Sequence, residues 1–386
     1  MIQRSTIVRA LAAAALAAFI AAPTARAENL TKATEALLKE AKMGPEVLTG
    51  LDAELAVPQA WIDGAKKEGL VKIRLTTAER LFAKAWQVFA ARYPGIEHEY
   101  VRGIGHERAV AALLAFKNGT YVSDVVSSFD VLQDEYEKAG ALARIDDLPT
   151  YKGIPAEYAS PKGLFTAYRL QHWCIGYNPQ KLKKAELPKS WGELVESPRW
   201  SNGKVGMAVN ANVWIPPLAG LYGDKWADDY MTAIFDKLKP QLRKERLSMI
   251  PQLNSLGEFD LGIPAGDFIY KVVQKRGMSI DFHCPEPVPT TVAPIGILAG
   301  NPHPNASKLF VNWVLSKEGQ LALHVHDSQI PAHNGMPAEK FMPYPAELAG
   351  KKRAPGTAAV VANIPNIMGK WHKLWISAVG AKIGGD

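Results

Sequence analysis

The hydrophobic pattern between residues 60 and 140 switches repeatedly between two periods. Residues 70–75 alternate apolar and polar side chains, which predicts a strand. Residues 79–93 place Phe82, Trp86 and Phe89 on one helical face, which predicts an amphipathic helix. We expect further strands at 96–101 and 124–126, and helices at 107–118 and 130–139. This order of elements predicts an α/β fold in which helices cover a parallel sheet.

The same alternation continues less regularly in the rest of the chain. We expect strands at 165–177, 204–209 and 277–283, and helices at 60–69, 224–238, 305–315 and 363–379. Residues 28–55 have helical spacing and end at Pro58, so residues 28–57 are interpreted as an N-terminal helical extension.

The first 27 residues have the features of a secretory signal peptide. Arg4 and Arg9 precede the uncharged run 10–22, and Ala25-Arg26-Ala27 forms a cleavage site. About 13 apolar residues are too few to cross a bilayer. We therefore expect cleavage after Ala27 and, because the alanine-rich signal is typical of bacteria, a periplasmic protein.

Composition excludes several classes of protein. With 386 residues, 47% apolar and 22% charged, the chain is neither disordered nor fibrous. The net charge is +7, but Arg4, Arg9 and Arg26 lie in the signal segment, which lowers the excess to +4 after cleavage. The remaining charges are interleaved rather than collected in a basic block, so we expect no binding to nucleic acid.

Enzyme motifs are absent from the sequence. It contains no G-x-S-x-G, no P-loop and no H-E-x-x-H. His324, His326 and His333 lie close in sequence, and we interpret them as surface histidines rather than metal ligands. The chain has only two cysteines, Cys174 and Cys284, and from the residues alone a disulfide and two buried thiols both stay open.

Several short segments occur in a characteristic order between residues 60 and 335. They are AKKEG at 65–69, YNP at 177–179, LPKSW at 187–191, PHPNA at 302–306, FVNWVLS at 310–316 and EGQ at 318–320. With these segments the sequence resembles the bacterial extracellular solute-binding proteins of ABC importers. The resemblance is to the branch of ferric-iron, polyamine, thiamine and aminoalkylphosphonate binders.

The resemblance implies a periplasmic-binding-protein fold of two lobes, each a mixed sheet flanked by helices, with a two-segment hinge. We place lobe 1 at 58–170 and 286–345, lobe 2 at 171–285, and a C-terminal helical tail at 346–386. Cys174 and Cys284 fall on the crossing segments, which run side by side in this family, so a disulfide with Cα atoms within about 7 Å is expected. The implied partners are an inner-membrane permease and ATPase, with a monomeric protein and no cofactor.

Two hydroxyl pairs are candidate ligand contacts. Thr76-Thr77 and Ser127-Ser128 each lie between the end of a strand and the start of a helix. Backbone N–H groups and hydroxyl donors at such positions suit a carboxylate, phosphonate or phosphate. Ordinary helix N-capping explains the same residues equally well.

Four further side chains have two interpretations each. Arg169 either pairs with an anion or forms a surface salt bridge. Trp214 either stacks on an organic solute or packs in the core. Asp267 either holds an ammonium group or caps the following helix. Glu286 likewise has either a ligand contact or a structural role.

These residues favour a small organic anion or zwitterion as the solute. The alternative is ferric iron, although the chain lacks the neighbouring tyrosine pair that ferric-binding relatives use. Iron would then need separate tyrosines, beginning with Tyr222 and Tyr230. A polyamine is less favoured because only Asp267 and Glu286 are obvious acids, and a periplasmic enzyme is the remote alternative.

Overall fold

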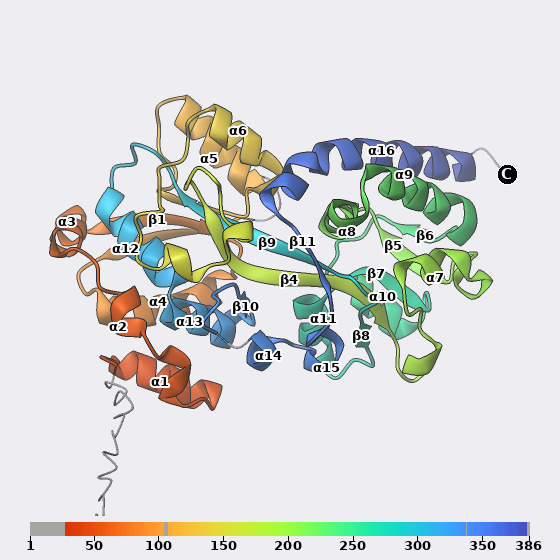
Figure 1. Cartoon of the computed structure of the whole chain (residues 1–386), viewed down its shortest axis with the longest axis horizontal. Helices are drawn as coiled ribbons and strands as arrows, with labels where there is room; N and C mark the ends of the chain where they lie inside the picture. Colours follow the sequence, from red (N-terminus) through yellow and green to blue (C-terminus); the bar gives the residue numbers. More distant parts are fainter. Residues whose placement is uncertain (1–27, 104–106, 337, 384–386) are drawn as a thin grey trace, which may run out of the picture.

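A computed structural model describes residues 28–103, 107–336 and 338–383, which form two lobes joined by long central strands (Figure 1). The proposed signal peptide at 1–27 lies outside the described residues. Within the described part of the chain, no helix is both long and apolar enough to cross a membrane.

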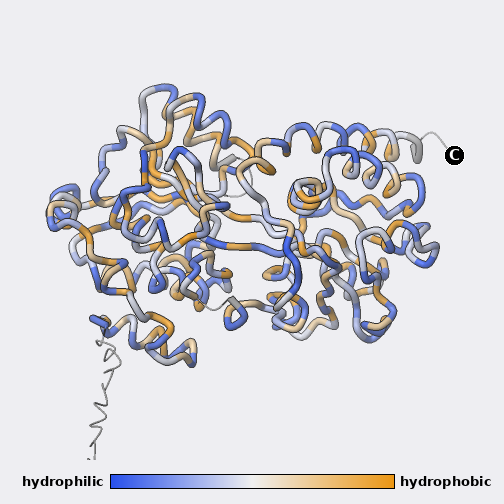
Figure 2. Tube along the Cα trace, viewed as in Figure 1, coloured by the Kyte–Doolittle hydropathy of each residue, from blue (hydrophilic) through white to orange (hydrophobic). Residues whose placement is uncertain are grey.

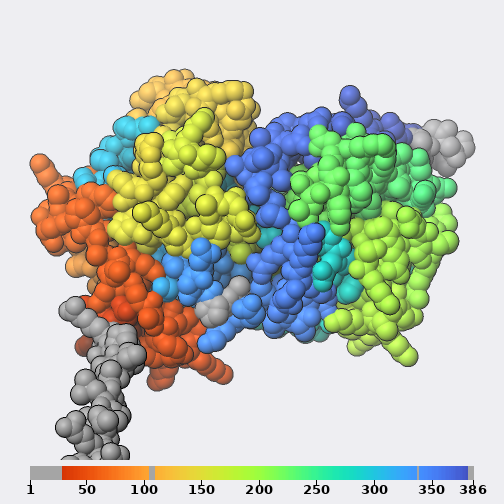
Figure 3. Space-filling model, in the orientation of Figure 1, coloured from red at the N-terminus to blue at the C-terminus, as the bar shows by residue number. Residues whose placement is uncertain are grey.

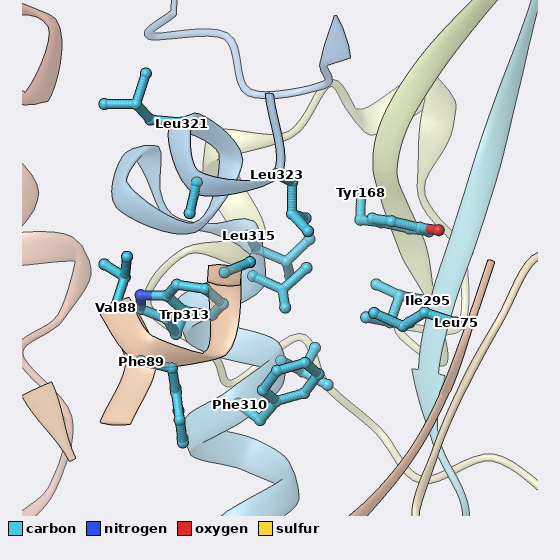
Figure 4. Close-up of a cluster of buried hydrophobic side chains, with 14 of the residues drawn as sticks. Leu75, Val88, Phe89, Tyr168, Ile295, Phe310, Trp313, Leu315, Leu321 and Leu323 are labelled. Carbon is cyan, nitrogen blue, oxygen red and sulfur yellow. The ribbon is translucent and has the colours of Figure 1, made fainter. Parts of the chain in front are cut away.

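The first lobe is built on the parallel strands that the alternating pattern predicts. β1 (Leu70–Leu75) lies between β2 (Glu97–Arg102) and β3 (Val125–Ser127). The helices of this lobe are α3 (Gln59–Glu68), α4 (Glu79–Arg92), α5 (Glu107–Lys117), α6 (Gln133–Lys138), α12 (Pro304–Leu315) and α13 (Lys317–Asp327). Figure 4 shows its core, where Phe89 of α4 packs edge-on against Trp313 of α12 with 5.6 Å between ring centroids.

The second lobe repeats the arrangement with a smaller sheet. β5 (Val205–Ala208) lies between β6 (Gln241–Arg243) and β7 (Leu261–Gly266), and all three are parallel. Its helices are α7 (Trp191–Glu196), α8 (Ile215–Tyr222), α9 (Asp224–Ala233), α10 (Ile250–Leu256) and α11 (Asp267–Gln274). In both lobes the hydrophobic residues concentrate on the inner strands and on the helix faces that cover them (Figure 2).

Two long antiparallel strands connect the lobes into one mixed sheet. β4 (Thr166–Tyr177) pairs with β9 (Val288–Ile297) through its first half and with β7 and β8 (Asp281–His283) through its second half. The strand order across both lobes is β2-β1-β3-β9-β4-β7-β5-β6. The strand expected at 277–283 is therefore shorter than predicted. β9 was not predicted because its two prolines, Pro289 and Pro294, conceal its extended pattern.

The chain crosses between the lobes a third time after α13. It passes through β10 (Ile330–Pro331), α14 (Ala338–Phe341) and α15 (Pro345–Leu348), and then β11 (Arg353–Pro355) pairs in parallel with β9. The last helix, α16 (Ala358–Ile383), packs mainly on α8 and α9 of the second lobe. In Figure 3 the blue chain that precedes this helix lies between the yellow and green halves of the molecule, and the helix itself runs over the top of the green half.

Both terminal segments are integrated into the lobes. α1 (Lys32–Ala41) and α2 (Leu51–Glu54) contribute Leu37 and Leu51 to the core of the first lobe. Thr34 of α1 donates a hydrogen bond to the buried Glu318 carboxylate at 2.5 Å, and α16 contributes Trp371 to the core of the second lobe. The remaining short turns are η1 (Pro45–Leu48), η2 (Asp130–Leu132), η3 (Tyr151–Gly153), η4 (Ala156–Tyr158), η5 (Lys184–Glu186), η6 (Pro198–Trp200), η7 (Ala211–Val213) and η8 (Ile234–Leu238).

Candidate functional site

The lobes enclose a cleft with two compartments that meet at Arg169 and Gln171 of β4, whose side chains line both. The first, about 370 Å³, is called here the arginine compartment and is lined by Thr76, Ala78, Leu81, Arg102, Arg169, Leu170, Gln171, Phe268, Val272, Arg276, Asp327, Ser328, Gln329 and Ile330. The second, about 140 Å³, is called the α16 compartment and is lined by Ser128, Asp130, Arg169, Gln171, Asn212, Val213, Pro217, Thr291, Val292, Ala293, Gly356, Val360, Val361 and Ile364.

Three arginines from different parts of the fold converge on the arginine compartment. Arg102 ends β2 of the first lobe, Arg169 lies on the connecting strand β4, and Arg276 follows α11 of the second lobe. None of the three forms an ion pair with a described carboxylate. Guanidinium groups bind carboxylate and phosphate oxygens in a forked geometry, so this wall is suited to an anion.

Arg169 is the most constrained of these cations. Its side chain is half-buried, and its guanidinium carbon lies 5.5 Å from the centroid of the Tyr168 ring. The Nε atom is buried and has no hydrogen-bond partner among the described residues. A desolvated cationic donor without a partner is costly, so an anion that enters the cleft restores interactions that the folded protein lacks.

Among the described residues, Asp327 is the one acidic side chain that lines the arginine compartment, and its carboxylate already accepts hydrogen bonds. Its Oδ2 atom accepts hydrogen bonds from Thr77 Oγ1 at 2.8 Å and from Gln329 Nε2 at 2.7 Å. The compartment therefore has three cations against one carboxylate, which favours a solute with net negative charge.

The two hydroxyl pairs are divided between the cleft and the interior. Thr76 lines the arginine compartment and Ser128 lines the α16 compartment, whereas Thr77 and Ser127 are buried. Ser127 donates to the carbonyl of Arg74 at 3.2 Å. N-capping does not explain these residues, because α4 begins after Ala78 and η2 begins after Phe129, both without a side-chain cap. Ser128 has φ of 50°, a left-handed conformation that is uncommon outside glycine and often marks functional sites.

Three candidate ligand residues lie away from the two compartments. Trp214 is fully buried in the core of the second lobe, 5.1 Å from the Trp191 ring, so it packs rather than stacks on a solute. Asp267 is fully buried, and its carboxylate lies 2.8 Å from Nδ1 of His172 rather than at the surface of the cleft. Glu286 is exposed, and its carboxylate accepts a hydrogen bond from the Lys352 backbone at 3.4 Å.

The tyrosines considered for iron are also outside the cleft. Tyr222 is 49% exposed and packs against Trp226, while Tyr230 is buried and donates to the Trp191 carbonyl at 2.9 Å. Burial raises the pKa of Tyr230 well above its ordinary value, which opposes the phenolate form that a metal needs.

The histidines expected at the surface are partly in the interior. His333 is buried 3.2 Å from a carboxylate oxygen of Glu54, and His324 donates through Nδ1 to the Gln329 carbonyl at 2.8 Å. The described residues contain no group of three histidine, cysteine or carboxylate side chains that is arranged to hold a metal ion.

Several cleft residues were missed by the sequence interpretation. Gln171 lies two positions from Arg169 on the predicted strand, and period-two alternation places both on one face. Asn212 belongs to the same segment as Trp214 and follows a predicted strand. Arg102 directly follows the predicted strand 96–101, whereas no local pattern points to Arg276.

Comparison with known proteins identifies the family of this chain. A model of the family described as bacterial extracellular solute-binding protein matches residues 122–349. An uncharacterised protein from Haemophilus influenzae is 30% identical over 157 residues, which is 38% of this chain and 43% of the relative. The chain thus matches less than half of the length of that relative.

Solved structures share the fold at low sequence identity. Iron-bound HitA from Pseudomonas aeruginosa has a TM-score of 0.66 and 20% identity, over 79% of this chain and 99% of that one. IdiA (FutA) from Trichodesmium, in complex with iron and citrate, has a TM-score of 0.66 and 15% identity over 79% and 99%. AfuA from Actinobacillus pleuropneumoniae, bound to fructose-6-phosphate, has a TM-score of 0.60 and 20% identity over 79% and 98%.

Proposed function

Because the chain belongs to the bacterial extracellular solute-binding protein family, we propose that it is the periplasmic binding subunit of an ABC importer for a small organic anion or zwitterion. The observation that carries the choice of an anion is the arginine compartment, where Arg102, Arg169 and Arg276 lack carboxylate partners among the described residues. A carboxylate or phosphonate would supply those partners with charge-assisted hydrogen bonds.

The compartment walls come from both lobes, which suits capture by closure. Thr76 and Arg102 belong to the first lobe, Phe268 and Arg276 to the second, and Arg169 to the strand between them. A solute that contacts both lobes and the connecting strand favours the closed conformation of the protein. Only in that conformation do cationic side chains bind the solute's negative charge from both sides. The protein would then present the closed complex to a membrane permease and its ATPase, without covalent chemistry.

Ferric iron is the second candidate, because two of the structural neighbours were solved with iron. In this chain Tyr222 and Tyr230 lie outside the cleft, and the walls of the arginine compartment are cationic. Iron would therefore require an accompanying anion at the arginines. One neighbour was solved with fructose-6-phosphate, and its anionic phosphate matches the chemistry of this wall more directly.

A thermal-shift screen on the chain from Glu28 onward tests the proposal. Organic acids, phosphonates, sugar phosphates, polyamines and ferric citrate are compared, since a ligand that binds only the folded state raises the melting temperature. We expect anions to raise it, and Arg169→Gln to remove the rise. Arg80→Gln is the matched control, because Arg80 is exposed on α4 and outside both compartments. Stabilisation by polyamines alone, or by ferric ions without an anion, contradicts the proposal.

A further inference from the structure

The two compartments of the cleft differ in chemistry along its length. The arginine compartment has three guanidinium groups, whereas the described residues that line the α16 compartment include one basic side chain, Arg169, and one acidic side chain, Asp130. Seven of the fourteen residues that line the α16 compartment are aliphatic, among them Pro217 and Val292 and, from the last helix, Val361 and Ile364. A solute that spans both compartments therefore meets a cationic wall at one end. At the other end it meets an apolar wall formed by Val360, Val361 and Ile364, beside polar residues such as Asp130 and Asn212.

The apolar wall is held in place by contacts outside the cleft. Lys370 of α16 binds both carboxylate oxygens of Asp228 at 2.9 Å, and Trp371 Nε1 donates to the Val209 carbonyl at 2.9 Å. Just before the helix, the Gly356 backbone donates to the Thr290 carbonyl at 2.7 Å, and a Cβ at this glycine would lie 3.2 Å from the same oxygen. The first half of α16 is thus held between β9, which contacts Gly356, and the second lobe, which contacts Lys370 and Trp371.

From this uneven cleft we propose that the solute is an anion with a short apolar tail. Its acidic group binds the arginine compartment, and its tail extends past Arg169 to Val360, Val361 and Ile364. The α16 compartment, about 140 Å³, is similar in size to the roughly 150 Å³ apolar cavity that accommodates a benzene molecule. A tail of about six heavy atoms therefore fits. This inference rests on the proposed function, because it specifies which end of the anion lies in which compartment of the same cleft.

A homologous series of ligands measures the tail directly. Straight-chain carboxylates from acetate to octanoate, and the corresponding alkylphosphonates, are titrated calorimetrically into the chain from Glu28 onward. Burial of one methylene contributes a factor of about four in Kd. We expect Kd to tighten about fourfold per carbon until the tail reaches about six carbons, and to stop improving beyond that length.

Variants of α16 locate the tail. Val361→Phe fills the α16 compartment, so affinity should no longer increase with the length of the ligand chain. The Kd for acetate should stay within about twofold of the parent value. Val361→Thr keeps the volume of the side chain but makes it polar, and should reduce the increase in affinity per added carbon. This second variant is informative if the larger phenylalanine impairs folding. Ile376→Phe is the matched control, because Ile376 lies on the same helix and is 69% exposed, away from the compartment.

The outcomes separate this inference from the proposed function. If anions bind and Arg169→Gln weakens them, but Kd is independent of tail length, the tail assignment is overturned and the anion-binding function stands. If the gain with length persists in Val361→Phe, the tail lies elsewhere and the assignment to α16 is overturned. If no member of either series binds, the tail assignment is overturned, and the anion-binding function is wrong only if the sugar phosphates and other anions of the thermal-shift screen also fail to bind.

Discussion

Cys174 on β4 and Cys284 after β8 are joined by a disulfide with 4.9 Å between their Cα atoms, inside the limit of about 7 Å for such a bond. The two residues are separated by 110 positions, and that stretch contains the strands β5, β6 and β7 of the second lobe. The bond therefore ties together the outgoing and returning passages of the chain at the base of this lobe. It lies in a small buried core with Tyr270 and Phe282.

Removing this disulfide should destabilise the protein without altering the cleft. Closing a loop of this length constrains the unfolded chain, and such bonds typically contribute about 2–5 kcal/mol. The double variant Cys174→Ala/Cys284→Ala should lose stability in that range, measured by urea unfolding, with solute affinity retained in the folded fraction. Thiol titration of the denatured, unreduced parent protein should find no free thiol; two free thiols would show that the bond does not form.

Arg169 and Thr77 should respond in opposite ways to substitution. Arg169→Gln removes a charged donor from the cleft and should weaken anion binding by about one to two decades in Kd, with little change in stability, because Arg169 has no ion pair to lose. Thr77→Val removes buried hydrogen bonds to Asp327 and Gln329 and should cost about 1–3 kcal/mol of stability.

Affinity and unfolding free energy are measured on both variants. The anion interpretation of Arg169 is wrong if its variant binds normally and is strongly destabilised instead. An unchanged stability for Thr77→Val would show that its hydroxyl does not hold Asp327 in solution.

Glu347 should make stability depend on pH in the acidic range. Burial raises its pKa, but hydrogen bonds from His283, Lys184 and the Cys284 N–H outweigh burial and lower the pKa to about 2. Because the folded pKa lies below the unfolded value of 4.5, this stabilisation is complete above about pH 4.5 and is lost as the pH falls through about 2.

Glu347→Gln tests this relationship. The variant should be less stable than the parent at pH 7 by about 1–3 kcal/mol, and the difference should shrink as the pH approaches 2. Glu196→Gln is the control, since Glu196 is exposed and has no ion pair among the described residues. A difference between parent and Glu347→Gln that is constant from pH 7 to pH 2 would refute the lowered pKa.

The last helix should be essential for the second lobe. Trp371 is fully buried in its core, and Trp371→Ala leaves a large cavity that should cost about 3–5 kcal/mol. Ile376→Ala on the exposed side of α16 should change stability by less than about 0.5 kcal/mol. Chemical unfolding followed by tryptophan fluorescence measures both. Equal, small effects would mean that α16 is a dispensable tail.

The local pattern of the sequence determined much of the framework. Alternation in 70–75 and helical periodicity in 79–93 reflect burial of one face, and they predicted β1 and α4 within a residue or two of their observed ends. The order of strands and helices predicted the parallel sheet. The resemblance to a two-lobed family, in which the two segments that connect the lobes run side by side, implied that Cys174 and Cys284 would be close together.

Only the tertiary structure decided which side chains face the cleft. Thr76 and Thr77 are adjacent and chemically equal, yet the rotation of the chain between β1 and α4 turns one into the arginine compartment and the other toward Asp327. Arg102 and Arg276 are 174 positions apart, and only the packing of two lobes around β4 brings them to one cavity. Likewise, the sequence pattern did not predict β9 or the segment from β10 to β11 that crosses between the lobes a third time. Their prolines suppress the local signal, and their extended form depends on hydrogen bonds to distant strands.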